Sequence, residues 1–67
     1  MNQDTRDAVT QQVNSLSYML DAAYAQAYEA AKRCPGQHGC HSWLCTVRDR
    51  LAGAREALPM VYTHLGR

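Results

Sequence analysis

Apolar residues recur along most of the chain at alternating intervals of four and three residues. In the first half they are Val9, Val13, Leu16, Leu20, Ala23, Ala27, Ala30 and Cys34. In the second half they are Leu44, Val47, Leu51, Ala54, Leu58, Val61 and Leu65. This spacing is typical of the a and d positions of helices that lie side by side at a shallow angle. The pattern therefore predicts two long helices, at about residues 4–33 and 42–65.

The two apolar stripes match each other when the chain is folded back on itself in its middle. Ala23 then faces Leu51, and Leu20 faces Ala54, so that a large aliphatic side chain meets an alanine in successive layers. Such alternation keeps the volume of each layer even and lets two helices approach closely. The sequence therefore predicts an all-α fold, an antiparallel helical hairpin that forms a single domain over residues 1–67.

Capping residues and prolines mark the ends of the expected helices. Asp4 is suited to cap the first helix and Ser42 the second, since short polar side chains accept hydrogen bonds from free backbone N–H groups. Pro35 cannot extend the first helix and restricts the residue before it, so we expect a turn at 34–41. Pro59 removes one hydrogen bond from the second helix, and we expect a kink there with the helix resuming beyond it.

Seven large apolar residues lie off the two stripes and favour a second interface. A chain of 67 residues buries only about 60% of its unfolded surface and gains from a partner. The simplest partner is a second copy, which would make a homodimer and a four-helix bundle. A groove for another protein's helix and ordinary scattered surface apolarity are the alternatives. The seven residues are Tyr18, Met19, Tyr24, Tyr28, Trp43, Met60 and Tyr62.

The expected turn gathers thiols and imidazoles that are suited to bind a metal ion. Three thiolates with one imidazole form an ordinary ligand set for structural zinc, whose binding energy would add to the folding of a small chain. The sequence does not choose between the two histidines, nor between zinc, iron and copper. The candidate ligands are Cys34, His38, Cys40, His41 and Cys45.

Three other states of the cysteines remain open beside the metal. A Cys34–Cys40 or Cys34–Cys45 disulfide would clasp the hairpin. Cα atoms on facing helices about 8–10 Å apart are farther apart than a disulfide favours, but this gap could close near the bend. An odd number of cysteines and a reducing compartment also favour the metal. Inert buried thiols are the second alternative. A reactive Cys45 near a helix N-terminus is the third.

The charge and the missing motifs indicate which kinds of function this chain is not expected to have. The formal net charge is +1, with 46% apolar and 19% charged residues, so the chain is globular and carries no strong field. The N-terminal segment has no apolar core typical of a signal peptide, and no run is long enough to span a bilayer, so we expect a cytoplasmic protein. No phosphate loop or acid–base couple is present, and we expect no enzymatic activity.

These observations favour a small interaction or regulatory protein with a metal in its turn. Its length and predicted architecture are similar to those of the plasmid Rop family, whose dimeric helical hairpins bind RNA, but no motif matches and no residues are transferred. A nucleic-acid binder is therefore one alternative, and a metal or redox carrier is another. Basic residues could line one surface but have acidic residues among them; they are Lys32, Arg33, Arg48, Arg50 and Arg55.

Overall fold

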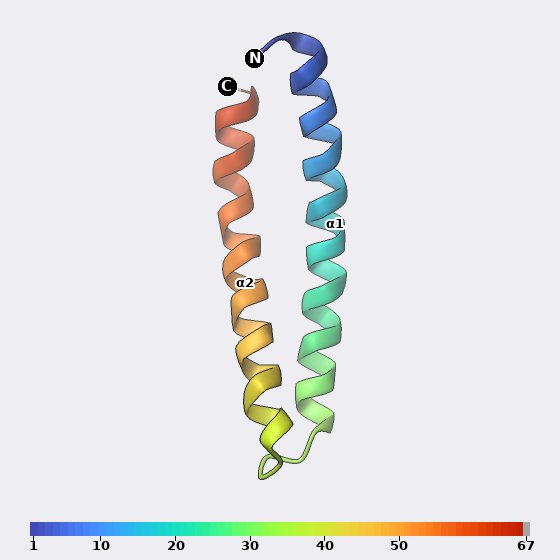
Figure 1. Cartoon of the computed structure of the whole chain (residues 1–67), viewed down its shortest axis with the longest axis vertical. Helices are drawn as coiled ribbons and strands as arrows, with labels where there is room; N and C mark the ends of the chain where they lie inside the picture. Colours follow the sequence, from blue (N-terminus) through green and yellow to red (C-terminus); the bar gives the residue numbers. More distant parts are fainter. Residues whose placement is uncertain (67) are drawn as a thin grey trace.

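A computed structural model describes residues 1–66, which form two long helices joined by a short turn (Figure 1). Helix α1 spans Gln3–Arg33 and helix α2 spans Gly39–Gly66, and the described residues contain no strand. The helices lie side by side and run antiparallel, so the two chain ends meet opposite the turn. The prediction of an all-α helical hairpin is confirmed. Neither described helix has a stretch long and apolar enough to cross a membrane.

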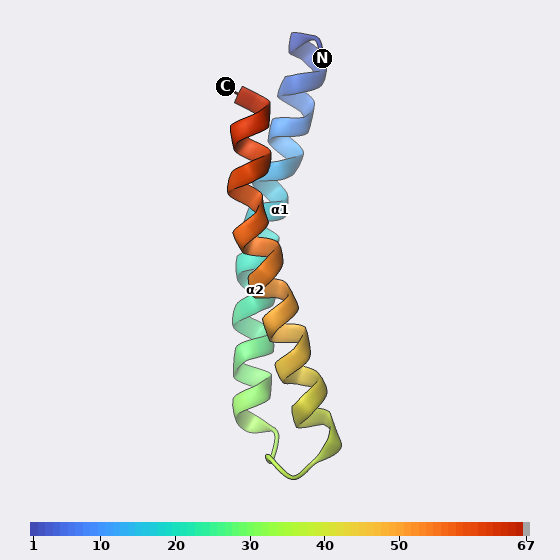
Figure 2. The ribbon, with the colours of Figure 1, turned by 90° about the vertical axis from the view of Figure 1, so that its left-hand side faces the viewer.

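The hairpin is a thin rod. Its principal extents are 52 × 15 × 12 Å and its radius of gyration is 15.6 Å, whereas a compact domain of this length has a radius of about 11 Å. Figure 2 shows α2 crossing in front of α1 at a shallow angle, in the left-handed sense of coiled coils. Each helix therefore has only one neighbour, and most of its circumference stays open to water.

Helix α1 is capped by Asn2 and not by Asp4. The Asn2 side chain accepts a hydrogen bond of 2.8 Å from the backbone N–H of Thr5. Asp4 lies inside the first turn, where its negative charge interacts favourably with the positive end of the helix dipole. The prediction of Asp4 as the cap is wrong, because the helix begins two residues earlier and Asn2 already satisfies a free N–H group.

Helix α1 ends where Pro35 restricts the chain. Cys34 has an extended backbone, with φ −76° and ψ 128°, and its N–H group still donates to the carbonyl of Ala30 at 3.0 Å. An extended conformation is the one that a following proline favours. The thiol of Cys34 is therefore placed at the exit of the helix, where the chain begins to reverse.

Helix α2 begins at Gly39, three residues before the predicted cap Ser42. Its first turn is capped by His38, whose Nδ1 accepts a hydrogen bond of 3.1 Å from the backbone N–H of Cys40. Ser42 lies within the helix, and its carbonyl accepts from the hydroxyl of Thr46 at 3.2 Å. The prediction of Ser42 as the cap is wrong, because an imidazole placed beside the first turn satisfies the free N–H group earlier in the chain.

The core of the hairpin is small. Among the described residues no side chain is completely buried. Near the chain ends, Val9 and Leu20 pack against the largest buried residues, while near the turn the buried residues are alanines, which let the helices approach closely. The buried apolar residues are Val13, Ala27, Ala31, Leu58 and Leu65.

The two apolar stripes are only partly buried between the helices. Half-buried Ser17 and Tyr24 of α1, and Arg48 and Ala52 of α2, lie nearer the helix contact than some stripe residues do. The exposed stripe residues recur every seven positions on each helix, so each helix is rotated about its axis away from a symmetrical a/d contact. The prediction that both stripes are buried in the hairpin is therefore wrong for five residues, which are Leu16, Ala23, Val47, Ala54 and Val61.

Polar contacts join the helices along one side of the rod. The Nε atom of Arg55 donates to Asp21 at 2.8 Å, and its guanidinium lies 4.6 Å from the centre of the Tyr24 ring. Closer to the chain ends, the hydroxyl of Tyr62 donates to the side-chain oxygen of Asn14 at 2.6 Å. Exposed contacts of this kind contribute about 0.2–1 kcal/mol each, so they fix the register of the hairpin more than its stability.

We predict that Gly53→Ala stabilises the protein. Gly53 lies in the middle of α2 without a positive φ, and a Cβ atom added there would contact nothing within 4 Å. Alanine should raise the free energy of unfolding by about 0.5–1 kcal/mol, because glycine loses more conformational freedom in a helix. Urea unfolding followed by circular dichroism measures the change.

The reverse substitution at an exposed helical site is the matched control. Ala25→Gly in α1 should lower the free energy of unfolding by a similar amount. A loss of stability in Gly53→Ala would contradict the open surroundings of this glycine and would indicate that another chain approaches the α2 backbone there.

Candidate metal and thiol sites at the turn

Two tight turns bring the end of α1 to the start of α2. The N–H group of His38 donates to the carbonyl of Pro35 at 2.9 Å, and the N–H group of His41 donates to the carbonyl of His38 at 3.0 Å. The chain therefore reverses within a few residues, and the side chains on both sides of the turn are drawn together.

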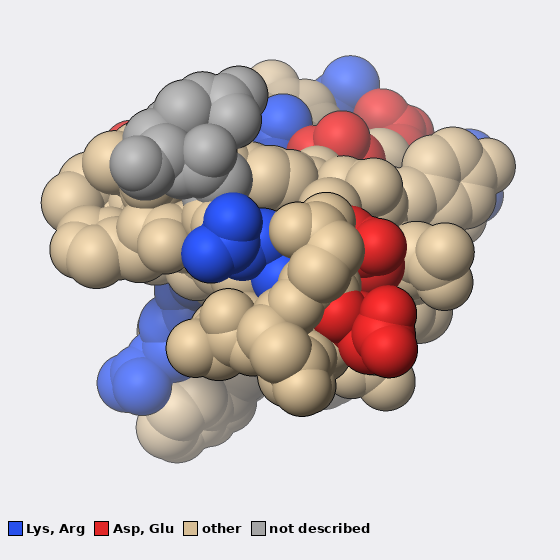
Figure 3. Space-filling model, turned by 90° about the horizontal axis from the view of Figure 1, so that it is seen from above, with Lys and Arg blue, Asp and Glu red and all other residues tan. Residues whose placement is uncertain are grey.

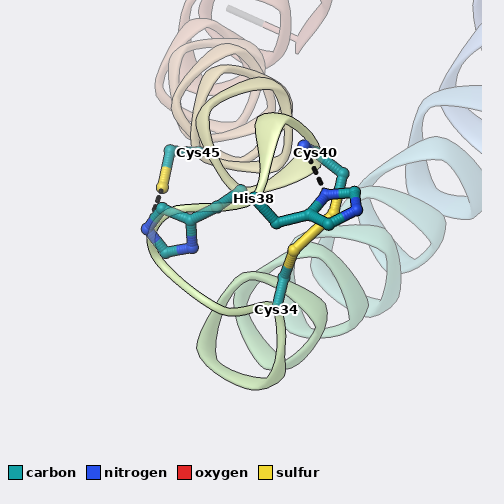
Figure 4. Close-up of a disulfide and its surroundings, with 5 residues drawn as sticks. Cys34, His38, Cys40 and Cys45 are labelled. Carbon is teal, nitrogen blue, oxygen red and sulfur yellow. Dashed lines mark hydrogen bonds between the residues drawn. A yellow bond between two sulfur atoms is a disulfide. The ribbon is translucent and has the colours of Figure 1, made fainter.

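Cys34 and Cys40 are joined as a disulfide (Figure 4). Their Cα atoms are 7.1 Å apart, closer than the facing positions of two packed helices. The structure therefore favours this disulfide, which on the sequence alone was a less favoured alternative to a metal site. The distance between facing helices does not apply here, because Cys34 lies beyond the end of α1 and Cys40 in the first turn of α2, where the chain converges.

The same two cysteines and His38 also form a cluster that could hold a metal ion. One sulfur from each cysteine and one nitrogen of His38 all lie within 4.8 Å of one another. Cys34 is half-buried, whereas His38 and Cys40 are exposed. Metal ligation requires thiolates, so the cluster can bind an ion only after the disulfide is reduced.

His38 cannot cap α2 and bind a metal at the same time. Its Nδ1 accepts from the N–H of Cys40, and a neutral imidazole then carries its proton on Nε2. Ligation through Nδ1 would displace the N–H group. Ligation through Nε2 would move the proton to Nδ1, which then has no lone pair to accept with. Metal binding through His38 therefore removes the helix cap.

His41 and Cys45 form a separate pair on α2. They are four residues apart and so lie on the same side of the helix, and the Nε2 atom of His41 is 3.6 Å from the Sγ atom of Cys45. Cys45 carries a free thiol, and Figure 4 shows it pointing away from the Cys34–Cys40 disulfide. The five candidate ligands are thus divided into a group of three and a pair.

The predicted interface residues do not share one environment. Tyr24 and Tyr62 take part in contacts between the two helices, and Tyr28 lies under the amino group of Lys32, which is 5.6 Å from the ring centre. The most exposed of the seven are Tyr18 and Trp43, at 78% and 73%. The set remains a prediction of a partner surface, and the structure adds a second set, which shares Met19 with the first.

That second set is an apolar face formed by both helices. Successive residues of a helix are about 100° apart, and the buried residues mark the direction of the neighbouring helix. On each helix, the exposed stripe residues lie about a quarter turn around the helix axis from that direction. This rotation has the same sense on α1 and on α2 when each helix is viewed from its own N-terminus. Because the helices run in opposite directions, both rotations point to the same side of the rod. The apolar face consists of Leu16, Met19, Ala23, Val47, Ala54 and Val61.

The apolar face carries almost no charge. The helical positions that extend it on α1 hold Gln12, Gln26 and Ala30, and on α2 they include one charged residue, Arg50. The polar contacts of Asp21 with Arg55 lie on the opposite side of the rod. The hairpin therefore has two unlike sides, and the stripe pattern of the sequence was the signal of the apolar one.

Fold and site together define a two-helix hairpin with a thiol-rich turn and one apolar face. No protein-family model, no curated protein and no solved structure matches the chain.

We predict that the cap depends on a side-chain acceptor at position 38. In the disulfide-bonded protein, His38→Ala should lower the free energy of unfolding by about 0.5–2 kcal/mol, because the N–H of Cys40 loses its partner. His38→Asn should keep nearly all of the stability, since asparagine is a preferred N-cap. Denaturant unfolding of the two variants measures the difference, and equal losses would show that the imidazole acts otherwise than as a cap.

Proposed function

We propose that this chain is a small cytoplasmic interaction protein without enzymatic activity, which acts as a homodimer of hairpins and carries a zinc site in its turn when its thiols are reduced. The observation that supports the dimer best is the apolar face. Five residues of two regular heptad stripes are exposed, and they lie together on one side of the rod.

A four-helix bundle explains why the stripes are half-exposed. In such a bundle each a/d stripe points between two neighbours, toward the common axis of the four helices. One part of the stripe then contacts the other helix of the hairpin, and the rest contacts the second hairpin. An isolated hairpin leaves that second part in water, as is seen for Leu16 and Val47, which are 44% and 47% exposed.

The exposed area agrees with one missing partner. The accessible surface is 5185 Å², whereas a compact monomer of this mass exposes about 4,250 Å². The excess of about 900 Å² is close to the area that each partner buries in a standard protein interface. A second copy is the most economical occupant, because the face combines complementary positions from both helices and a two-fold axis would bury it on each copy.

We predict that Met19→Glu converts the dimer into a monomer. The substitution places a charge on the apolar face at a side chain that is 58% exposed in the single hairpin, so it should not disturb the hairpin itself. Analytical ultracentrifugation should show the wild-type chain at twice the monomer mass and the variant at the monomer mass.

Tyr18→Glu is the matched control for this experiment. Tyr18 is the neighbouring residue and is 78% exposed, but it is rotated about 100° away from Met19. This variant should remain dimeric. A monomeric wild-type protein would overturn the proposed dimer, and dissociation by Tyr18→Glu alone would place the interface on the aromatic residues outside the apolar face.

The charge distribution supports a protein partner over a nucleic acid. Figure 3 shows basic and acidic groups together at the end of the rod that carries the chain termini. A nucleic-acid-binding surface requires a basic excess to neutralise phosphates. Three of the five basic residues considered above lie within 4 Å of a carboxylate, in the pairs Lys32–Glu29, Arg48–Asp49 and Arg55–Asp21.

The zinc site is supported by the cluster of Cys34, His38 and Cys40. A reducing cytoplasm would open the disulfide and supply two thiolates, and His38 would add the third donor. The fourth position of a tetrahedral zinc would be open to water or to a ligand from another chain. The ion would then replace the disulfide as the bond between the helices, and it would remove the His38 cap of α2.

We predict that reduction of the Cys34–Cys40 disulfide lowers the stability of the hairpin and that zinc bound to the same two cysteines restores it. Reduction with a phosphine should lower the free energy of unfolding by about 2 kcal/mol, because the loop closed by the disulfide is released. One equivalent of zinc should restore stability and a chelator should remove it again. Thermal unfolding followed by circular dichroism measures each step.

Two serine variants locate the metal. Cys40→Ser should abolish the effect of zinc, whereas Cys45→Ser should leave it intact, because Cys45 lies outside the three-residue cluster. No effect of zinc on the reduced wild-type protein would overturn the metal site, and loss of the effect in Cys45→Ser would show that the ligand set is different.

A further inference from the structure

Cys45 is the cysteine that the Cys34–Cys40 disulfide leaves as a free thiol. It is half-buried and lies 3.6 Å from the Nε2 atom of His41. The other ring nitrogen of His41, Nδ1, is buried and has no hydrogen-bond partner among the described residues. A buried nitrogen without a partner costs free energy, so water or a polar group of a ligand is favoured beside the half-buried His41.

The thiol opens into a small cavity at the junction of the two helices. The cavity has a volume of about 150 Å³, and its lining includes two cationic side chains, one from each helix. It lies on the polar side of the rod, opposite the apolar face, so a dimer formed through that face leaves it open. The lining residues are Tyr28, Ala31, Lys32, His41, Cys45 and Arg48.

Arg48 is the less exposed of the two cations of the cavity. A hydrogen bond to Asp49 raises the pKa of the Arg48 guanidinium further above its ordinary value. The carboxylates that accompany the cations, Glu29 and Asp49, are 55% and 70% exposed and do not line the cavity. Water therefore screens Asp49 more than it screens its partner Arg48, whose side chain is 30% exposed. Lys32 and Glu29, by contrast, are similarly exposed, at 62% and 55%.

A metal ion fits this pocket poorly. It would find only the two ligands of His41 and Cys45, and Lys32 and Arg48 would repel it. Both cations have a carboxylate partner outside the cavity, so the attraction for an anion comes mainly from Arg48, which is the less exposed of the two. A soft nucleophile in a cationic cavity is suited to a small disulfide that carries carboxylates, since thiols react with disulfides and the charge selects the reagent.

We propose that Cys45 is a site of S-thiolation by anionic low-molecular-weight disulfides, which Lys32 and Arg48 select by their charge. Cys45 sulfur attacks one sulfur of the reagent, whose S–S bond breaks as the new Cys45–S–S–R bond forms. The second sulfur leaves as a thiolate and takes up the proton that Cys45 gave to the solvent. Cys45 is oxidised and the leaving half of the reagent is reduced, so no further oxidant is required.

The test compares two reagents that differ in charge. Dithiobis(nitrobenzoate), a dianionic aromatic disulfide, and dithiodipyridine, a neutral one, are reacted with the disulfide-bonded protein and with a short peptide that contains a single cysteine. Relative to the peptide, the ratio of anionic to neutral rate constants should be about five- to tenfold higher in the protein. The enhancement should fall as the salt concentration rises.

Charge variants assign the selectivity to the cavity. Arg48→Gln and Lys32→Gln should each lower the rate ratio toward that of the peptide. Arg50→Gln is the matched control, since Arg50 is exposed on the same helix but does not line the cavity, and it should leave the ratio unchanged. The ratio cancels differences in exposure or folding, which change both rates together.

Three results would overturn the proposal. The first is a rate ratio equal to that of the peptide, and the second is a ratio that Arg48→Gln does not alter. The third is a mixed disulfide that peptide mapping places on Cys34 or Cys40, which would show that the reagent exchanges with the existing disulfide. A single adduct on Cys45, absent in Cys45→Ser, is the expected product.

Discussion

The structure depends on the contact of two apolar stripes that are broader than one helix neighbour can cover. Leucine and valine near the chain ends and alanine near the turn hold α1 against α2. The remaining part of each stripe is left on one side of the rod, where it forms the apolar face. The proposed dimer follows from this constraint, because a helix with an unsatisfied apolar side gains stability by burying it. The polar contacts on the opposite side fix the register and leave that side open.

The turn concentrates several kinds of chemistry in a few residues because the chain must reverse there. Cys34 directly follows α1, Cys40 lies in the first turn of α2, and His38 lies between them in the chain and caps α2. The disulfide and the capped imidazole belong to one state, while a metal bound by the same residues would require thiolates and an uncapped helix. The redox state of the two sulfurs therefore decides whether the helices are joined by a disulfide or carry thiols that could bind a metal. Cys45 is outside this exchange and has surroundings of its own.

Sequence patterns predicted the fold well and the site only in part. The intervals of the apolar residues were enough for two helices and an antiparallel hairpin, since period and length leave few other solutions. The caps were misassigned because several polar residues near each helix start can accept the same hydrogen bond, and only the local backbone selects Asn2 and His38. The five candidate ligands were recognised by type. Their division into two groups depends on the turn, which brings Cys34 and His38 to Cys40, and on the side of α2 that carries His41 and Cys45.

By itself, the sequence determined two long helices, a reversal near Pro35 and an apolar stripe on each helix, because these follow from local periodicity and from the missing N–H of proline. Only the tertiary structure decided which stripe residues face the neighbouring helix and which face outward. It also decided that Cys34 meets Cys40 and that Cys45 meets His41. The physical reason is that such contacts depend on the rotation of each helix about its axis, and one hairpin contact fixes that rotation for all side chains together.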